Sequence, residues 1–269
     1  MPDSGINTLA PVTGLAVTLA DGVLSVTINR PDSLNSLTLP VLAGIADAME
    51  HAATDPLVKV VRIGGAGRGF SSGAGMSADD VSAGVSSDLI DEINRAVRAI
   101  VALPRPVVAV VHGPAAGVGV SLALACDLVL ASEAAFFMLA FTKIGLMPDG
   151  GASALVASAV GRIKAMRMAL LAERLPAAEA LAHGLVSAVY PTDEFAAEVD
   201  KVVAALLAGP AVAFAKTKEA INAATLTELD RALERERRGQ TQLLRSPDFR
   251  EGATAFQQRR AATFTDSLS

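Results

Sequence analysis

The stretch PVVAVVHGPAAGVGVSLALACDLVLA, residues 106–131, decides the fold class. Its first run, 107–111, is short, apolar and mostly β-branched, which predicts a buried strand. Five Gly or Pro positions interrupt the apolar stretch before Asp127 closes it, so it does not predict a membrane span. We interpret it instead as a strand, a turn, a helix over 117–125 and a second strand over 127–131, a unit typical of α/β proteins.

The same alternation of strands and helices extends along the chain on both sides. Strands are predicted at 15–29 (as a hairpin turning at Asp21-Gly22), 58–63, 136–140 and 186–190. Helices are predicted at 40–53 (with Thr38 as its cap), 88–103, 152–160 and 162–172. After Asp193 the pattern is helical alone, at 194–208, 211–223, 227–245 and 247–259. The sequence therefore predicts an α/β body followed by a helical extension.

Composition excludes several classes of protein. Hydrophobic residues make up 51% of the 269 positions and charged residues 19%, which excludes disorder as the dominant state. The net charge of −5 argues against nucleic acid or an anionic membrane as a partner. The three histidines and the single Cys126 show none of the usual zinc-ligand spacings, so no metal site is expected.

Two features indicate a cytoplasmic protein. Cys126 cannot form an internal disulfide, which fits a reducing compartment. The first residues, MPDSGINTLAPVTG, have neither the basic nor the apolar region of a signal peptide.

The glycine-rich segment 64–75 allows more than one interpretation. Its part GFSSG, 69–73, matches the G-x-S-x-G nucleophile elbow of serine hydrolases, with His112 and His183 downstream. A loop with incidental serines is the alternative. Neither 64–75 nor 117–122 carries a complete phosphate-loop or dinucleotide motif.

Two further features can be structural or chemical. The turns at 73–75 and 113–119 could present backbone N–H groups to an oxyanion, or could simply be tight turns. Asp149 follows a proline and precedes two glycines and an apolar helix. It could be a catalytic carboxylate, or the cap of that helix.

Six motifs in this order resemble the crotonase superfamily, the enoyl-CoA hydratases and isomerases. They are INRPDSLNSL (28–37), GFSSGAG (69–75), RPVVAVVHG (105–113), ALACD (123–127), KIGLMP (143–148) and EGATAFQQR (251–259). The resemblance covers nearly the whole chain. It implies a ββα spiral core over 1–192 that binds an acyl-CoA thioester, and a helical domain over 193–269 for trimerisation and for covering CoA. Homotrimers or homohexamers are the assemblies that it implies.

The resemblance also implies roles for individual residues. The oxyanion donors would be the N–H groups of Ala74 and Val118. Contacts to CoA would come from Ser33, Leu34, Ser72, Phe256 and Arg259, and Lys216 and Lys218 could meet its phosphates. CoA enters as part of the substrate, so no separate cofactor is expected, and neither nucleic acid nor a membrane is expected as a partner.

The chain departs from the family's hydratases at their two glutamates. Ser121 and Phe141 stand at those positions, and neither is a good proton carrier at neutral pH. Asp149 stands where relatives that isomerise dienoyl-CoA or a ring substrate carry a carboxylate. The resemblance thus implies an enoyl-CoA isomerase with Asp149 as proton carrier. A hydratase with an atypical residue set and a weakly active acyl-CoA binder remain alternatives.

Overall fold

In the computed structural model, which describes residues 9–75 and 87–267, a β-hairpin opens the fold. Strands β1 (Leu15–Ala20) and β2 (Val23–Ile28) pair antiparallel, with Ala20 opposite Val23. Asp21 and Gly22 between them have φ angles of 50° and 82°. Two consecutive left-handed residues make the turn that suits the twist of a hairpin, as the Asp-Gly pair predicts. Residues 1–8, part of the segment on which the signal-peptide expectation rests, lie outside the described residues.

The hairpin forms one edge of a six-stranded sheet with the order β1-β2-β3-β4-β6-β9. Every pair after the hairpin is parallel. The added strands are β3 (Val60–Gly65), β4 (Val107–Val111), β6 (Leu128–Ser132) and β9 (Ala188–Tyr190). Central β4 is buried almost throughout, because helices cover both faces of a parallel sheet.

Alternate residues of these strands enter two separate cores. Val61, Val107 and Val129 belong to the main core, together with buried residues of α1 (Leu39–Thr54), α3 (Ser87–Ala102) and α4 (Val118–Ala125). Val60 and Leu130 face α7 (Phe195–Leu207) and form a smaller core with it. Since strand residues alternate between faces, α7 covers the face of the sheet opposite α1 and α3.

A second, smaller sheet lies beside α4. It consists of β5 (Ala115–Ala116), β7 (Phe136–Met138) and β8 (Leu175–Pro176), and the short helices η2 (Pro31–Ser33), η3 (Ala140–Ile144) and α6 (Ala177–Ala182) flank the two sheets. The helix α5 (Ala152–Leu171) is broken at Gly161, whose φ is 74°, as the two predicted helices imply. β5, β8 and α6 were not predicted, since segments this short carry no periodicity.

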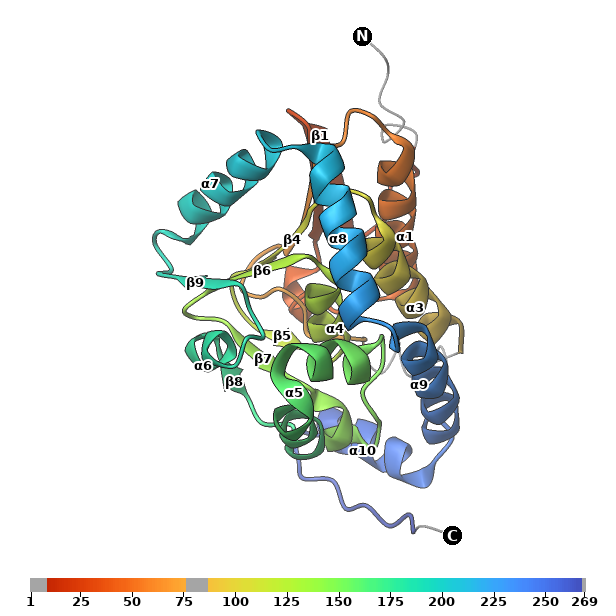
Figure 1. The fold of residues 1–269 in the computed structure, drawn as a ribbon. Helices are drawn as coiled ribbons and strands as arrows, with labels where there is room; N and C mark the ends of the chain where they lie inside the picture. The colour runs from red at the N-terminus through yellow and green to blue at the C-terminus, as the bar shows by residue number, and fades with distance from the viewer. Residues whose placement is uncertain (1–8, 76–86, 268–269) are drawn as a thin grey trace.

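The C-terminal helices pack back onto the body (Figure 1). They are α8 (Ala211–Thr225), α9 (Leu229–Leu243) and α10 (Pro247–Gln257). α9 contacts α3 and α5, and α10 packs on η3. The predicted helical extension is therefore confirmed, and it reaches the segment that carries Asp149.

One predicted cap is wrong. Thr38 does stand at the N-cap position of α1, but its side chain accepts no capping hydrogen bond. Pro40 in the first turn supplies a fixed φ and removes one unpaired N–H there, which reduces the need for a cap.

Candidate active site

Two turns of the chain meet at the start of α4, and a glycine stands in each. Gly73 and Gly117 have φ angles of 89° and 52°, a region that favours glycine. A methyl group on Gly73 would lie 2.8 Å from the carbonyl oxygen of Ala116 and 3.4 Å from the nitrogen of Val118. The two backbones therefore touch, and a side chain at Gly73 would push them apart.

The amides of Ala74 and Val118 directly follow these glycines. Ala74 forms a parallel bridge with Leu37, whose N–H donates to Gly73 and whose carbonyl accepts from Gly75. The N–H of Ala74 itself points away from that bridge. Val118 begins α4, so its N–H has no acceptor within the helix. Neither amide donates a hydrogen bond within the described part of the chain, so two adjacent backbone donors are available to an oxyanion.

Asn35 anchors the loop that leads into the first turn. It is fully buried, and its Nδ2 donates to the carbonyls of Ala66 and Gly69, both at 2.7 Å. Its Oδ1 accepts from the backbone N–H of Arg30 at 2.9 Å. All the main polar positions of this amide are thus used to hold the glycine-rich loop in place.

Ser71 has a structural role, and the hydrolase interpretation of 69–73 is wrong. Its Oγ donates to the carbonyl of Asn35 at 2.8 Å and accepts from the N–H of Gly73 at 3.1 Å. A serine nucleophile needs a base on its hydroxyl. His112 pairs instead with the carbonyl of Gly67.

Asp149 is a buried carboxyl with one oxygen unsatisfied. Asp149 is only 4% exposed. Oδ2 accepts a hydrogen bond from Nε2 of Gln240 at 2.8 Å, whereas Oδ1 has no partner among the described residues. Burial raises the pKa of Asp149 to about 7. The hydrogen bond from Gln240 lowers this pKa, and the negative charge of Glu236 raises it. A carboxyl poised near neutrality can both take and return a proton.

The interpretation of Asp149 as a helix cap is wrong. The N-cap of α5 is Gly151, and no side chain of that position caps the helix. The first N–H groups of α5 are satisfied from α9: Gly151 donates to Oε2 of Glu236 at 2.6 Å and Ser153 to Oε1 at 2.8 Å. The side chain of Asp149 is therefore not needed to begin the helix.

Ser121 contacts Asp149 from α4, the helix that Val118 begins. Its Oγ donates to the backbone carbonyl of Asp149 at 2.8 Å. Ser121 lies three residues after Val118 in α4, less than one helical turn away. Phe141 is buried on the other side, with its ring tip 3.8 Å from where a methyl group on Gly117 would lie. Asp149, the paired amides, Ser121 and Phe141 thus all lie around the start of α4.

Glu236 and Gln240 were missed by the sequence analysis. Both are almost completely buried on α9. Gln240 also accepts from the N–H of Met147 and donates to its carbonyl, at 3.2 and 3.0 Å. Their burial could have been predicted from their spacing, since the two continue the buried stripe that begins with Leu229 and Leu233.

Three of the residues expected to contact CoA come together. Ser72 donates from Oγ to the carbonyl of Ser33 at 2.9 Å and from its N–H to the carbonyl of Leu34 at 2.9 Å. Leu34 has a left-handed φ of 54°. Ser72 lies two positions before Ala74, on the loop that Asn35 holds, and its hydrogen bonds bring Ser33 and Leu34 to that loop.

The other expected CoA contacts lie elsewhere. Phe256 is 61% exposed near the end of α10, and Arg259 follows that helix; no hydrogen bond joins either residue to the Ser33 region in the described residues. Lys216 pairs with Glu219 on the surface of α8. Lys218 does not fit the expectation, because its ammonium is bonded to Asp127 and to the carbonyls of Ile100 and Arg105.

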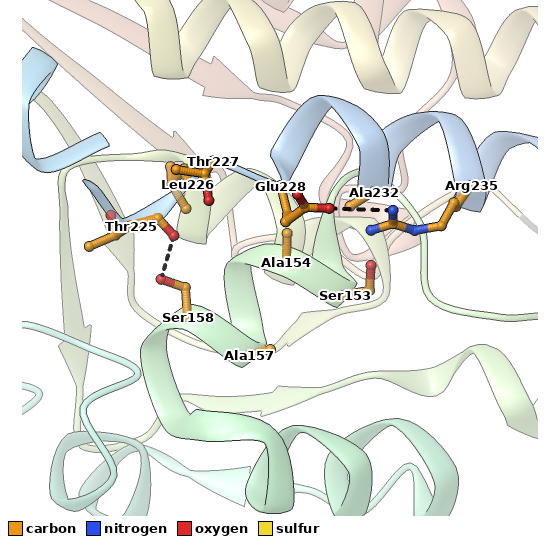
Figure 2. Close-up of a pocket in the computed structure, with 10 residues that line it drawn as sticks. All are labelled: Ser153, Ala154, Ala157, Ser158, Thr225, Leu226, Thr227, Glu228, Ala232 and Arg235. Atoms are coloured by element: carbon orange, nitrogen blue, oxygen red, sulfur yellow. Dashed lines mark hydrogen bonds and ion pairs between the residues drawn. The ribbon is translucent and has the colours of Figure 1, made fainter. Parts of the chain in front are cut away.

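A groove of about 340 Å³ lies between α5 and the junction of α8 with α9 (Figure 2). Ser158 donates to the carbonyl of Thr225 across one part of it, and Glu228 pairs with Arg235 in another. The groove contains none of the residues predicted for the site, so the predicted chemistry does not lie there.

Neither a metal cluster nor a membrane span is found in the described residues. Within residues 9–75 and 87–267, no group of three His, Cys, Asp or Glu side chains could hold a metal ion. None of the helices described is long and apolar enough to cross a bilayer.

Fold and comparisons together define the class. The mainly parallel sheet, the small second sheet and the returning C-terminal helices are the fold of the crotonase superfamily. The family model described as enoyl-CoA hydratase/isomerase matches residues 18–267. The chain belongs to the enoyl-CoA hydratase/isomerase family.

Individual relatives carry both kinds of name. The chain is 36% identical to 1,2-epoxyphenylacetyl-CoA isomerase of Escherichia coli, over 91% of this chain and 95% of that one. It is 37% identical to a probable enoyl-CoA hydratase of Rhodobacter capsulatus, over 92% and 96%. A crystal structure of an enoyl-CoA hydratase from Mycobacterium avium subsp. paratuberculosis matches with a TM-score of 0.91 and 79% identity, over 95% and 100%.

Proposed function

We propose that this protein is an enoyl-CoA isomerase that moves a double bond, with Asp149 as its proton carrier. In the direction from a 3-enoyl to a 2-enoyl thioester, Oδ1 of Asp149 removes a proton from C2. The electron pair moves onto the thioester oxygen, which receives hydrogen bonds from the N–H groups of Ala74 and Val118. Asp149 then returns the same proton to C4, and the thioester carbonyl forms again.

The observation that carries the proposal is Oδ1 of Asp149, which has no hydrogen-bond partner within residues 9–75 and 87–267. A buried carboxylate oxygen without a partner is costly, and such an atom in a native protein calls for an explanation. The substrate's reacting carbon provides one. Isomerisation requires a single proton carrier, and Ser121 and Phe141 supply no second one.

A hydratase is the second candidate, favoured by the 79% identity to the crystal structure described as an enoyl-CoA hydratase. Hydration needs a base for water and an acid for the carbon. Asp149 would have to serve with Ser121, whose hydroxyl is bonded to the backbone carbonyl of Asp149.

One pair of assays on the unmodified protein separates the two candidates. The first measures conversion of a 3-enoyl-CoA to the 2-enoyl-CoA, and the second measures hydration of crotonyl-CoA in ¹⁸O-labelled water. We expect isomerisation to be the faster reaction. Hydration at tens of turnovers per second or more, in the range of ordinary enzymes, with slower isomerisation would favour the hydratase. Binding of the CoA esters without either reaction would favour a binder.

The CoA moiety is proposed to lie along Ser33, Leu34 and Ser72, whose mutual hydrogen bonds shape one loop next to Ala74. The exposed Phe256 and the neighbouring Arg259 are proposed to cover it from α10. These hydrogen bonds hold the loop in one shape, which favours binding, since little ordering is required.

A trimer or hexamer in the cytoplasm is the proposed state of the protein. The second half of α5 presents an exposed apolar face: Ile163, Met166 and Leu170 are 78%, 44% and 65% exposed. Their spacing places them on one side of the helix. Such a face is typical of a surface that another protomer covers. Sedimentation at micromolar concentration should give a trimer or larger, and a monomer would contradict the assembly.

A further inference from the structure

Helix α9 contributes two buried polar side chains to the Asp149 segment, which it approaches from the far end of the sequence. Glu236 and Gln240 are 1% and 2% exposed and lie one turn apart. They follow Leu229 and Leu233 on the same buried stripe. Apolar side chains there would bury without a desolvation cost, so contact with the body alone does not account for a carboxylate and an amide.

Gln240 fixes one face of the carboxyl. Its Nε2 has two hydrogens, which go to the carbonyl of Met147 at 3.0 Å and to Oδ2 of Asp149 at 2.8 Å. Its Oε1 accepts from the N–H of Met147 at 3.2 Å. Reversing the amide would set its oxygen against two other oxygens, so the network permits one orientation.

Glu236 fixes the chain just beyond Asp149. It accepts the N–H groups of Gly151 and Ser153 with its two oxygens. Gly150 and Gly151 have φ angles of 65° and 77°, so this short connection would be adaptable without such an anchor. The negative charge of Glu236 at the N-terminus of α5 also interacts favourably with the helix dipole.

We propose that Gln240 and Glu236 are positioning residues for Asp149, which hold the carboxyl so that Oδ1 alone faces the reacting carbon. The proposal rests on the proposed function. Gln240 occupies Oδ2 and the backbone of Met147, and Glu236 holds the start of α5. Ser121 fixes the backbone carbonyl of Asp149 from α4. The freedom of the carboxyl to rotate away from substrate is thereby removed, as efficient proton transfer requires.

The two side chains act on the charge of Asp149 in opposite directions. The hydrogen bond from Gln240 lowers the pKa of Asp149, and the negative charge of Glu236 raises it. The other packed elements present no charge to it among the described contacts: α4 presents the Ser121 hydroxyl, and Ile93 of α3 packs against Gly150. Removing Gln240 should therefore raise the pKa of Asp149, and removing the charge of Glu236 should lower it.

The test is the pH profile of kcat/KM for isomerisation in the full-length protein. The active form has an ionised Asp149, so activity rises with pH. In Gln240→Met this rise should move to higher pH by about half to one unit, with kcat falling about tenfold and KM within about twofold. In Glu236→Gln the rise should move to lower pH. Gln242→Met, the same change on the exposed side of α9, is the control and should leave the profile unchanged.

Opposite shifts support the proposal, and a uniform loss at every pH with no shift overturns it, because that result describes a merely structural role. Thermal unfolding shows whether each variant folds. If Gln240→Met does not, Gln240→Asn replaces it with the same expected direction. Asp149→Asn is assayed alongside. Normal turnover in that variant overturns the proposed function itself, whereas its loss with unchanged Gln240 and Glu236 variants overturns the positioning role alone.

Discussion

The two halves of the site are built in different ways. The donors at Ala74 and Val118 are backbone amides, placed by glycines that immediately precede them. Asp149 is a side chain whose partner, Gln240, is 91 residues further along the chain. A backbone donor needs only the local conformation of its loop. A buried carboxyl needs remote groups to balance its desolvation and to set its orientation.

The largest expected effect comes from the backbone half. In Gly73→Ala the new methyl group would lie 2.8 Å from the carbonyl of Ala116, at a φ of 89°. The two turns must then separate, and the N–H groups of Ala74 and Val118 can no longer donate to the same oxyanion. Isomerase turnover should fall about 10²- to 10³-fold, the range for losing an oxyanion donor. Steady-state kinetics with a 3-enoyl-CoA measures it.

A matched control separates geometry from backbone strain. Gly161 has a similar φ of 74°, but a methyl group there meets nothing within 4 Å. Gly161→Ala should therefore lose some stability with turnover close to that of the unmodified protein. Equal losses of turnover in the two variants would break the distinction between the halves.

The raised pKa of Asp149 should make the stability of the protein depend on pH. The pKa of Asp149 is raised from 3.8 in the unfolded chain to about 7, so the native state binds the extra proton between these values. Stability contributed by this group is therefore lost as the pH rises from about 4 to 7, by up to roughly 4 kcal/mol. Asp149→Asn cannot titrate. Its stability relative to the unmodified protein should increase over that interval.

Denaturant unfolding at pH 4, 5.5 and 8 measures this difference. Asp91 is a suitable control, because it is half-exposed and its pKa is lowered by the hydrogen bond from Arg237. Asp91→Asn should show no such gain with pH. A constant difference between Asp149→Asn and the unmodified protein at all three values would contradict the raised pKa.

The smallest effect concerns a lysine that has no part in either half. In Lys218→Met, Asp127 loses its ammonium partner, and the stability should fall by about 1–3 kcal/mol. KM for a CoA ester should not change. Lys216→Met, on the exposed side of the same helix, should change the stability much less, because its pair with Glu219 is exposed to solvent. An increased KM in Lys218→Met would restore the phosphate role for this lysine.

The sequence predicts local features well and remote partners poorly. The hairpin at Asp21-Gly22, the strand over 107–111 and the break at Gly161 follow from turn chemistry and periodicity, and the structure confirms them. The glycine turns at 73–75 and 113–119 can likewise be recognised in the sequence, and they contain the amides of Ala74 and Val118. Ion pairing of Lys218 with Asp127 depends on how α8 docks, which periodicity does not encode.

Gln240 illustrates the same limit within the site. Its place on a buried stripe can be read from spacing, but its partner depends on how α9 crosses the start of α5. The two elements lie far apart in sequence, and their crossing is set by packing of the whole body. Asp149 itself was identified through the family resemblance, and the structure then excluded its role as a cap.

The central claim is tested most directly by Asp149→Asn, measured for turnover and for CoA-ester binding on one preparation. The amide keeps the shape of the carboxyl and can still accept from Gln240, but it cannot carry the proton. The account predicts that conversion of a 3-enoyl to a 2-enoyl thioester falls about 10²-fold or more while the dissociation constant of the CoA ester stays within about twofold. Turnover equal to that of the unmodified protein, or loss of binding together with turnover, would contradict it.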